Sequence, residues 1–79
     1  MNIQDLETIL RDENIREDAY DLSGGHRPET YTLRRGSGGE WFYYYSEKGQ
    51  ESDRRQFRTE SDACEYILAK LRADPNTKA

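Results

Sequence analysis

Residues able to do acid–base or nucleophilic chemistry are scarce in this chain of 79 residues. The one histidine, His26, precedes Pro28 in a glycine-rich stretch, where we expect a solvated side chain rather than a general base. The one cysteine, Cys64, falls on the apolar stripe of a predicted helix, so we expect a core thiol. No pair of Cys or His has zinc-ligand spacing. The sequence therefore predicts no catalytic site, no metal site and no cofactor.

Carboxylates gather in the first part of the chain and give the molecule an uneven charge. Residues 1–30 carry eight acidic and three basic side chains, a net of −5, whereas residues 31–58 have a net of +2. The acidic candidates for contact with a partner are Asp12, Glu13, Glu17, Asp18 and Asp21. Such a segment can speed association with a basic protein. The same charges also suit a solvated surface with no partner.

A second candidate surface comes from five consecutive aromatic residues in the middle of the chain. A strand sends alternate side chains to opposite faces. Trp41, Tyr43 and Tyr45 are predicted to face the core, which leaves Phe42 and Tyr44 on the other face.

The flanking predicted strands supply the expected neighbours of these two outward rings, Thr32 and Arg34 on one side and Arg54 or Gln56 on the other. Aromatic and arginine side chains together are enriched at protein interfaces. The alternative is that Phe42 and Tyr44 only shield the sheet, with arginine stems lying over the rings.

The elements that position these residues form a predicted α+β fold of order α-β-β-β-α. Apolar spacing predicts an N-terminal helix capped by Asn2 and a C-terminal helix that begins after Thr59 and stops at Asp74-Pro75. Three strands, at residues 29–35, 40–47 and 51–58, form a three-stranded antiparallel meander. Residues 15–22 allow a short helix. Both terminal helices are predicted to cover one face of the sheet, so that the other face stays open.

The length suits one domain, which we place at residues 1–75 with a frayed tail at 76–79. A single cysteine fits a reducing compartment, and no apolar run is long enough to span a bilayer. We therefore expect a cytoplasmic protein that does not enter a membrane. An open sheet face is compatible with either a monomer or a homodimer.

The second half of the sequence resembles a family of small bacterial immunity proteins from polymorphic or contact-dependent toxin systems. The resemblance rests on Trp41, the turn Tyr44-Tyr45-Ser46-Glu47-x-Gly49, Phe57, Thr59-Glu60 and Ala63-Cys64, with Ala19-Tyr20 and Gly24-Gly25 upstream. It implies a stoichiometric inhibitor of a cognate toxin domain and no enzymatic activity. The toxin is a nuclease in one version of this hypothesis, since nucleases are basic and their inhibitors are commonly acidic.

The alternative hypothesis is a small module that binds single-stranded nucleic acid by stacking bases on the outward aromatics. The net charge of −4 opposes it, because phosphate neutralisation supplies much of the affinity of such proteins. The order of elements also matches double-stranded-RNA-binding domains, but the start of the last helix is acidic at Glu60 and Asp62.

Overall fold

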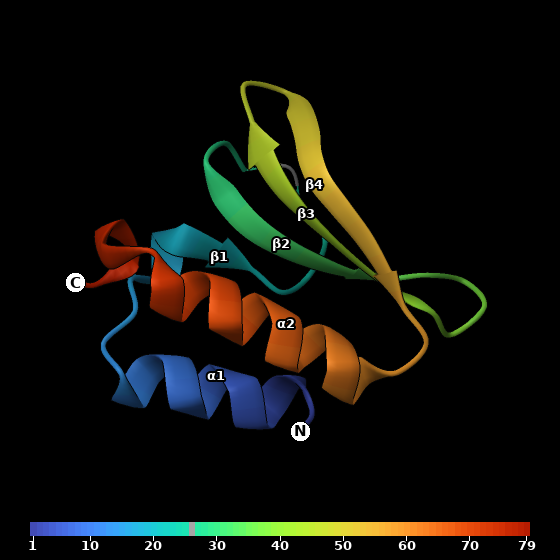
Figure 1. The fold of residues 1–79 in the computed structure, drawn as a ribbon, viewed down its shortest axis with the longest axis horizontal. Helices are drawn as coiled ribbons and strands as arrows, with labels where there is room; N and C mark the ends of the chain where they lie inside the picture. Colours follow the sequence, from blue (N-terminus) through green and yellow to red (C-terminus); the bar gives the residue numbers. More distant parts are fainter. Residues whose placement is uncertain (26) are drawn as a thin grey trace.

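The computed structural model describes residues 1–25 and 27–79 and has an α+β fold built on a four-stranded sheet (Figure 1). The strands follow the order β1 (Tyr20–Asp21), β2 (Thr30–Arg35), β3 (Trp41–Glu47) and β4 (Gln50–Phe57). The helices are α1 (Ile3–Asp12) and α2 (Glu60–Ala73), with short 3-10 turns η1 (Glu17–Ala19) and η2 (Pro75–Thr77). His26, for which we expected a solvated side chain, lies outside the described residues.

The predicted antiparallel meander is present as β2, β3 and β4, with Leu33 opposite Tyr43 and Trp41 opposite Phe57. The prediction of only three strands is wrong, because β1 adds a fourth strand that runs parallel to β2. The short helix allowed at residues 15–22 is reduced to the single turn η1, which leads straight into β1. A strand of two residues is too short to produce a periodic pattern in the sequence.

Lys48 and Gly49 form the tight two-residue turn between β3 and β4. Both residues have positive φ angles, +49° and +80°. Hairpin turns with positive φ at both central residues match the natural right-handed twist of the two strands. The glycine therefore meets a backbone requirement, which accounts for this part of the sequence pattern.

The core lies between the sheet and α2, which packs directly against β2, β3 and β4 (Figure 1). Leu33, Trp41 and Tyr43 are buried there as predicted, whereas Tyr45 is half-buried. The buried helical residues opposite them are Ala63, Cys64, Ile67, Leu68 and Leu71. We call this side of the sheet the first face and the opposite side the second face.

Helix α1 packs mainly on α2 rather than on the sheet, so α2 alone forms the direct helical cover of the first face. Asn2 caps α1 in a reciprocal arrangement with Asp5, as the sequence predicts for the cap. The carboxylate of Glu60 accepts a hydrogen bond of 2.7 Å from the backbone N–H of Ile3. This bond joins the start of α1 to the start of α2.

The C-terminal residues are held by hydrogen bonds, where we expected a frayed tail. The backbone N–H of Arg16 donates to the carbonyl of Thr77 at 2.7 Å, and the N–H of Ala79 donates to the carbonyl of Asn14 at 2.8 Å. Thr77 is 2% exposed, and its hydroxyl lies 2.8 Å from the carbonyl oxygens of Leu71 and Asp74. The segment thus closes the end of α2 and packs against the residues that follow α1.

Replacing this hydroxyl tests the docking of the C-terminal segment. Thr77→Val keeps the shape of the side chain but removes the hydroxyl hydrogen bonds to the carbonyls of Leu71 and Asp74, which keep only their backbone donors, so the free energy of unfolding should fall by about 1 kcal/mol. Thr8→Val is the matched control, since Thr8 is exposed, and should change stability by less than about 0.5 kcal/mol. Urea unfolding measures both, and equal effects would contradict a docked segment.

Candidate functional site

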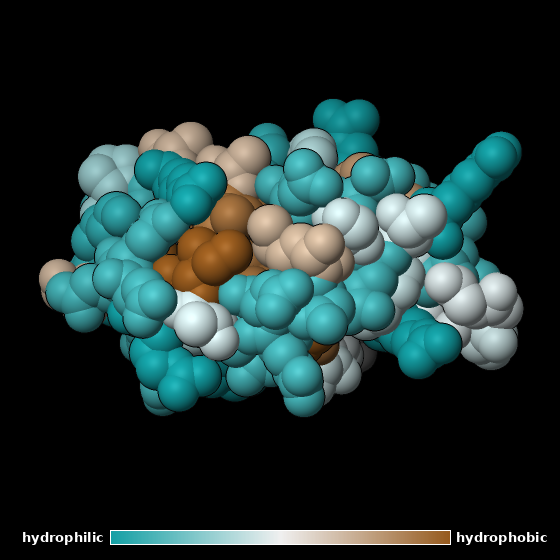
Figure 2. All heavy atoms as spheres, turned by 90° about the horizontal axis from the view of Figure 1, so that it is seen from below, coloured by the Kyte–Doolittle hydropathy of each residue, from teal (hydrophilic) through white to brown (hydrophobic). Residues whose placement is uncertain are grey.

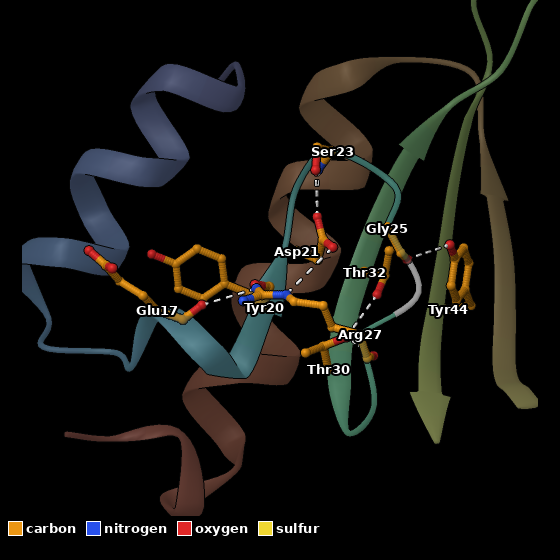
Figure 3. Close-up of polar contacts among 9 residues, drawn as sticks. All are labelled: Glu17, Tyr20, Asp21, Ser23, Gly25, Arg27, Thr30, Thr32 and Tyr44. Carbon is orange, nitrogen blue, oxygen red and sulfur yellow. Dashed lines mark hydrogen bonds and ion pairs between the residues drawn. The ribbon is translucent and has the colours of Figure 1, made fainter. Parts of the chain in front are cut away.

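The second face of the sheet is partly covered by residues 22–25 and 27–29, which belong to the connection between the parallel strands β1 and β2. Figure 3 shows Gly25 beside Tyr44, and Arg27 near Thr30. Thr30 and Thr32, which lie beneath this connection, are 1% and 0% exposed, with their hydroxyl oxygens 3.2 Å apart. The hydroxyl of Thr30 also donates to the carbonyl of Arg27 at 2.8 Å. The connection therefore closes the half of this face that lies nearest β1.

A buried carboxylate fixes the connection. Asp21 is 8% exposed and accepts hydrogen bonds from the backbone N–H of Ser23 at 3.0 Å and from its hydroxyl at 2.7 Å. Arg27 lies 3.7 Å from the same carboxylate and donates to the carbonyls of Glu17 and Tyr20. Burial favours a higher pKa for Asp21, but the hydrogen bonds from Ser23 and Gly25 and the Arg27 charge outweigh it. The pKa of Asp21 is therefore lower than its usual 3.8.

Tyr44 is buried by this connection, so the prediction that its ring projects freely from an open face is wrong. The ring is 2% exposed, and the phenol donates a hydrogen bond of 3.3 Å to the carbonyl of Gly25 (Figure 3). The connection can lie this close to the sheet because residue 24 is a glycine. A Cβ atom at Gly24, where φ is +80°, would lie 2.8 Å from the Arg34 side chain. The prediction that the Tyr44 side chain points to the second face is confirmed, but the sequence does not predict that the connection covers it.

The uncovered half of the second face holds a hollow of about 290 Å³ around Phe42, which we call the arginine hollow. Its lining residues are Arg34, Phe42, Tyr43, Tyr44, Glu51, Arg54, Arg55 and Gln56. Phe42 is half-buried, and the guanidinium of Arg34 lies 5.2 Å from its ring centroid. The structure thus brings four of the predicted contact residues to one hollow, namely Arg34, Phe42, Arg54 and the buried Tyr44. Glu51, 3.5 Å from Arg54, was missed because the register across β3 and β4 is not visible in the sequence.

Strand β4 forms one edge of the sheet, and a bulge interrupts it. Asp53 and Arg54 together lie opposite Tyr44, because Tyr43 pairs with Arg55 and Tyr45 pairs with Ser52. Asp53 has a φ of +53° and makes an ion pair of 3.2 Å with Lys70 of α2. Bulges and charged side chains both hinder the addition of a further strand to an edge. The side chains of the face, rather than the backbone of the edge, are therefore the accessible contact groups here.

The five predicted acidic contact residues do not form one patch. Asp21 is buried in the network described above. Glu13 accepts hydrogen bonds of 3.0 Å from Arg72, which lower the pKa of its carboxyl group. Asp18 pairs with Arg16 at 3.0 Å, while Asp12 and Glu17 are exposed. The negative potential of this segment is thus reduced by internal ion pairs.

A larger hollow, of about 440 Å³, separates α1 from β1 and the connection after it. Its rim carries both signs of charge, with Glu7 and Glu17 against Arg11 and Arg27. Figure 2, seen from the side of α1, shows only a small apolar area enclosed by hydrophilic residues. Apolar patches of interaction sites are usually larger than this. The mixed charges select no class of ligand, so we assign this hollow no role.

The residues that carry the family resemblance are largely structural. Trp41, Tyr44, Ser46, Ala63 and Cys64 are buried. Burial raises the pKa of the Cys64 thiol to about 11, which makes a thiolate nucleophile unfavourable. Among the other residues of this motif, Thr59 caps α2 through the backbone N–H of Asp62, and Glu60 binds the start of α1. The motif therefore describes the scaffold, while the arginine hollow lies mostly outside it.

Residues 1–25 and 27–79 contain no group of three or more His, Cys, Asp or Glu side chains placed to hold a metal ion. In that same part of the chain, neither helix is long and apolar enough to cross a membrane. Comparison with protein-family models, with curated proteins and with solved structures finds no significant match. Function therefore has to be argued from the surfaces described above.

The Asp21 network predicts a defined pH dependence. Asp21→Asn removes the charge that Ser23 and Arg27 bind, so the free energy of unfolding at pH 7 should fall by about 1–3 kcal/mol. Because the folded-state pKa is lowered, this stabilisation is present above the usual value of 3.8 and is lost as the pH falls below it. The difference in free energy of unfolding between wild type and variant should therefore shrink as the pH falls from about 5 to about 2, the range over which this carboxylate titrates.

Chemical unfolding at a series of pH values measures this difference. Asp12→Asn is the control, since Asp12 is exposed at the end of α1. A constant gap between wild type and Asp21→Asn across this pH range would contradict the assigned role of the carboxylate.

Proposed function

We propose that this chain is a bacterial immunity protein that binds a cognate toxin domain and inhibits it by stoichiometric protein–protein contact. The observation that carries the proposal is the Arg34–Phe42 pair in the arginine hollow, where the exposed Arg34 guanidinium lies 5.2 Å from the centroid of the half-buried Phe42 ring. A half-buried aromatic ring beneath a guanidinium presents both an apolar surface and hydrogen-bond donors. Arginine and aromatic side chains of this kind dominate the binding energy of many interfaces.

The composition of the hollow supports a protein ligand. Arg34 and Arg54 line it beside Glu51, whereas the Arg55 guanidinium lies 6.0 Å from the centroid of the Tyr66 ring and 3.4 Å from Asp53. The hollow therefore has two positive charges against one negative charge, in a chain whose net charge is −4. The Arg54 side chain stays 67% exposed although it forms an ion pair with Glu51. A toxin surface that carries carboxylates and an apolar side chain would complement these groups.

The division between scaffold and surface also supports this function. The residues that resemble the immunity family build the core and the caps, and they leave the surface of the second face to other positions. A family of inhibitors that share a fold but meet different toxins requires such a division, because specificity is a difference of affinities between partners. Inhibition by binding requires no catalytic group. The place of action proposed is the cytoplasm of the producing cell.

The single-stranded nucleic-acid hypothesis loses support from the burial of Tyr44. Phe42 remains the one half-exposed ring in the hollow among the described residues. One stacked base contributes about 1–3 kcal/mol, which by itself corresponds to a Kd weaker than about 1 mM. Binding of single-stranded RNA at moderate salt would nevertheless replace the proposal, so an RNA titration belongs to the same set of assays.

The arginine hollow can be tested by co-expressing the chain with the toxin domain encoded by the neighbouring gene. Phe42→Ala and Arg34→Ala should each raise the Kd of the complex at least about tenfold, as expected for residues at the centre of an interface. Both variants should also weaken protection of growing cells from the toxin. Calorimetry on the purified complex gives the Kd, and thermal unfolding verifies that each variant is folded.

Gln4→Ala on the exposed side of α1 serves as the control and should leave the Kd within about twofold of wild type. The proposal is wrong if the chain forms no complex with the toxin domain and gives no protection. If a complex forms but Phe42→Ala and Arg34→Ala bind normally, the immunity function stands and the arginine hollow does not carry it.

The exposed acidic residues of η1 are proposed to steer the encounter with a basic toxin. Glu17→Lys combined with Asp18→Lys should slow association by about three- to tenfold at low salt and reduce its dependence on ionic strength. Stopped-flow mixing measures the association rate, and the dissociation rate should change little. An unchanged association rate would remove the steering role while leaving the contact surface untouched.

A further inference from the structure

A third surface, on the first face of the sheet beyond the cover of α2, has a composition suited to a cation. A hollow of about 240 Å³ is lined by Tyr31, Tyr43, Tyr45, Ser52, Asp53 and Lys70. We call it the tyrosine pocket. It lies beside the C-terminal half of α2, on the opposite side of the sheet from the arginine hollow. Neither the resemblance nor the proposed toxin-binding surface assigns it a role.

The aromatic wall of the pocket is held in place by contacts within the chain. The rings of Tyr31 and Tyr45 pack edge to face, with centroids 4.9 Å apart and planes inclined by 64°. The phenol of Tyr31 donates a hydrogen bond of 2.8 Å to the carboxylate of Asp74, just after α2. Tyr31 and Tyr45 are both half-buried, so each ring keeps an accessible part. A fixed pair of rings presents π electrons to a ligand without a large ordering cost.

Carboxylates outnumber cations around this wall. Asp53 lines the pocket, and its side chain stays 33% exposed while it pairs with Lys70 at 3.2 Å and with Arg55 at 3.4 Å. Burial raises the pKa of the Tyr45 phenol, and the charges of Glu47, Glu29 and Asp74 raise it further. These carboxylates therefore lie close enough to act on the ring electrostatically. Lys70 is the one cation that lines the pocket among the described residues.

We propose that the tyrosine pocket binds the cationic side chain of an arginine presented by a protein partner. The guanidinium would lie against the Tyr45 ring, where cation–π attraction acts, with Asp53 as hydrogen-bond acceptor. Arginine fits better than lysine because its planar group stacks on a ring and donates to a carboxylate at the same time. The inference does not depend on toxin inhibition, since any partner with an exposed arginine of suitable reach would satisfy it.

The test uses a blocked tripeptide, acetyl-Gly-Arg-Gly-amide, titrated into the isotope-labelled protein while the ring resonances of Tyr31 and Tyr45 are followed by NMR. We expect saturable shifts of these resonances with a Kd on the order of 1–10 mM, and weaker binding as salt is added. The neutral peptide acetyl-Gly-Gln-Gly-amide should leave them unchanged at the same concentrations.

Variants distinguish ring contact from general attraction to an acidic surface. Tyr45→Ala should weaken binding of the arginine peptide at least about fivefold, because the stacking ring is lost. Tyr45→Phe keeps the ring and should bind within about twofold of wild type, with Tyr31 shifts as the readout. Gln4→Ala, at an exposed position of α1, is the control and should bind normally.

The proposal is overturned if the arginine peptide produces no saturable shift, if the glutamine peptide binds equally well, or if Tyr45→Ala binds like wild type. Because the peptide assay contains no toxin, a failure of the growth-protection assay has no effect on its outcome. The two proposals therefore stand or fall separately.

Discussion

The carboxylate of Asp21 fixes Ser23 and Arg27 in the loop that covers part of the second face of the sheet, and the burial of Thr30, Thr32 and Tyr44 depends on that arrangement. The long helix α2 packs on the first face, so the opposite face needs another cover. A loop can serve because its backbone carbonyls find donors in the face itself, namely Tyr44 and Thr30. The loop accounts for the parallel pairing of β1 and β2, since a crossing connection is required between strands that run the same way.

The local cover divides the second face into two parts with different roles. Under the loop, polar and aromatic side chains are sealed and satisfied, as buried polar groups must be. Beyond it, Phe42 and the surrounding arginines remain accessible in the arginine hollow. The position of the loop edge therefore decides which residues a partner can reach. Gly24 allows the loop to lie close to Arg34 on this face, and Gly25 leaves room for the Asp21 carboxylate.

The sequence predicts the parts of this structure that depend on periodicity and caps. Apolar spacing and the Asn2 and Thr59 caps locate both helices, and the side-chain alternation of β3 assigns Trp41 and Tyr43 to the core. Strand β1 is not predicted because two residues are too few to show the side-chain alternation of a strand. The burial of Tyr44 escapes it because the covering loop is a tertiary contact. The aspartate-x-serine-glycine sequence at the start of the loop is a turn signal, but it does not show where the turn leads.

The candidate surfaces follow the same division. The sequence groups Arg34, Phe42 and Arg54 correctly because cross-strand neighbours share a face. The predicted acidic group is divided because Glu13 binds Arg72, which is distant in the chain, and Asp21 binds Ser23, which is close to it in the chain. No pattern in the sequence indicates the tyrosine pocket. Its Tyr31 and Tyr45 were both assigned to the core by alternation, and their exposure depends on where α2 ends, which the strand pattern does not report.

The bulge at Asp53 has a consequence for the behaviour of many copies in a crowded cell. Long, regular edge strands can recruit like strands from other molecules and extend into fibrils. Here β1 offers only two residues at one edge, and β4 is broken in its middle at the other. Neither edge presents an uninterrupted template. A chain with this geometry therefore resists the edge-to-edge strand addition through which such fibrils grow.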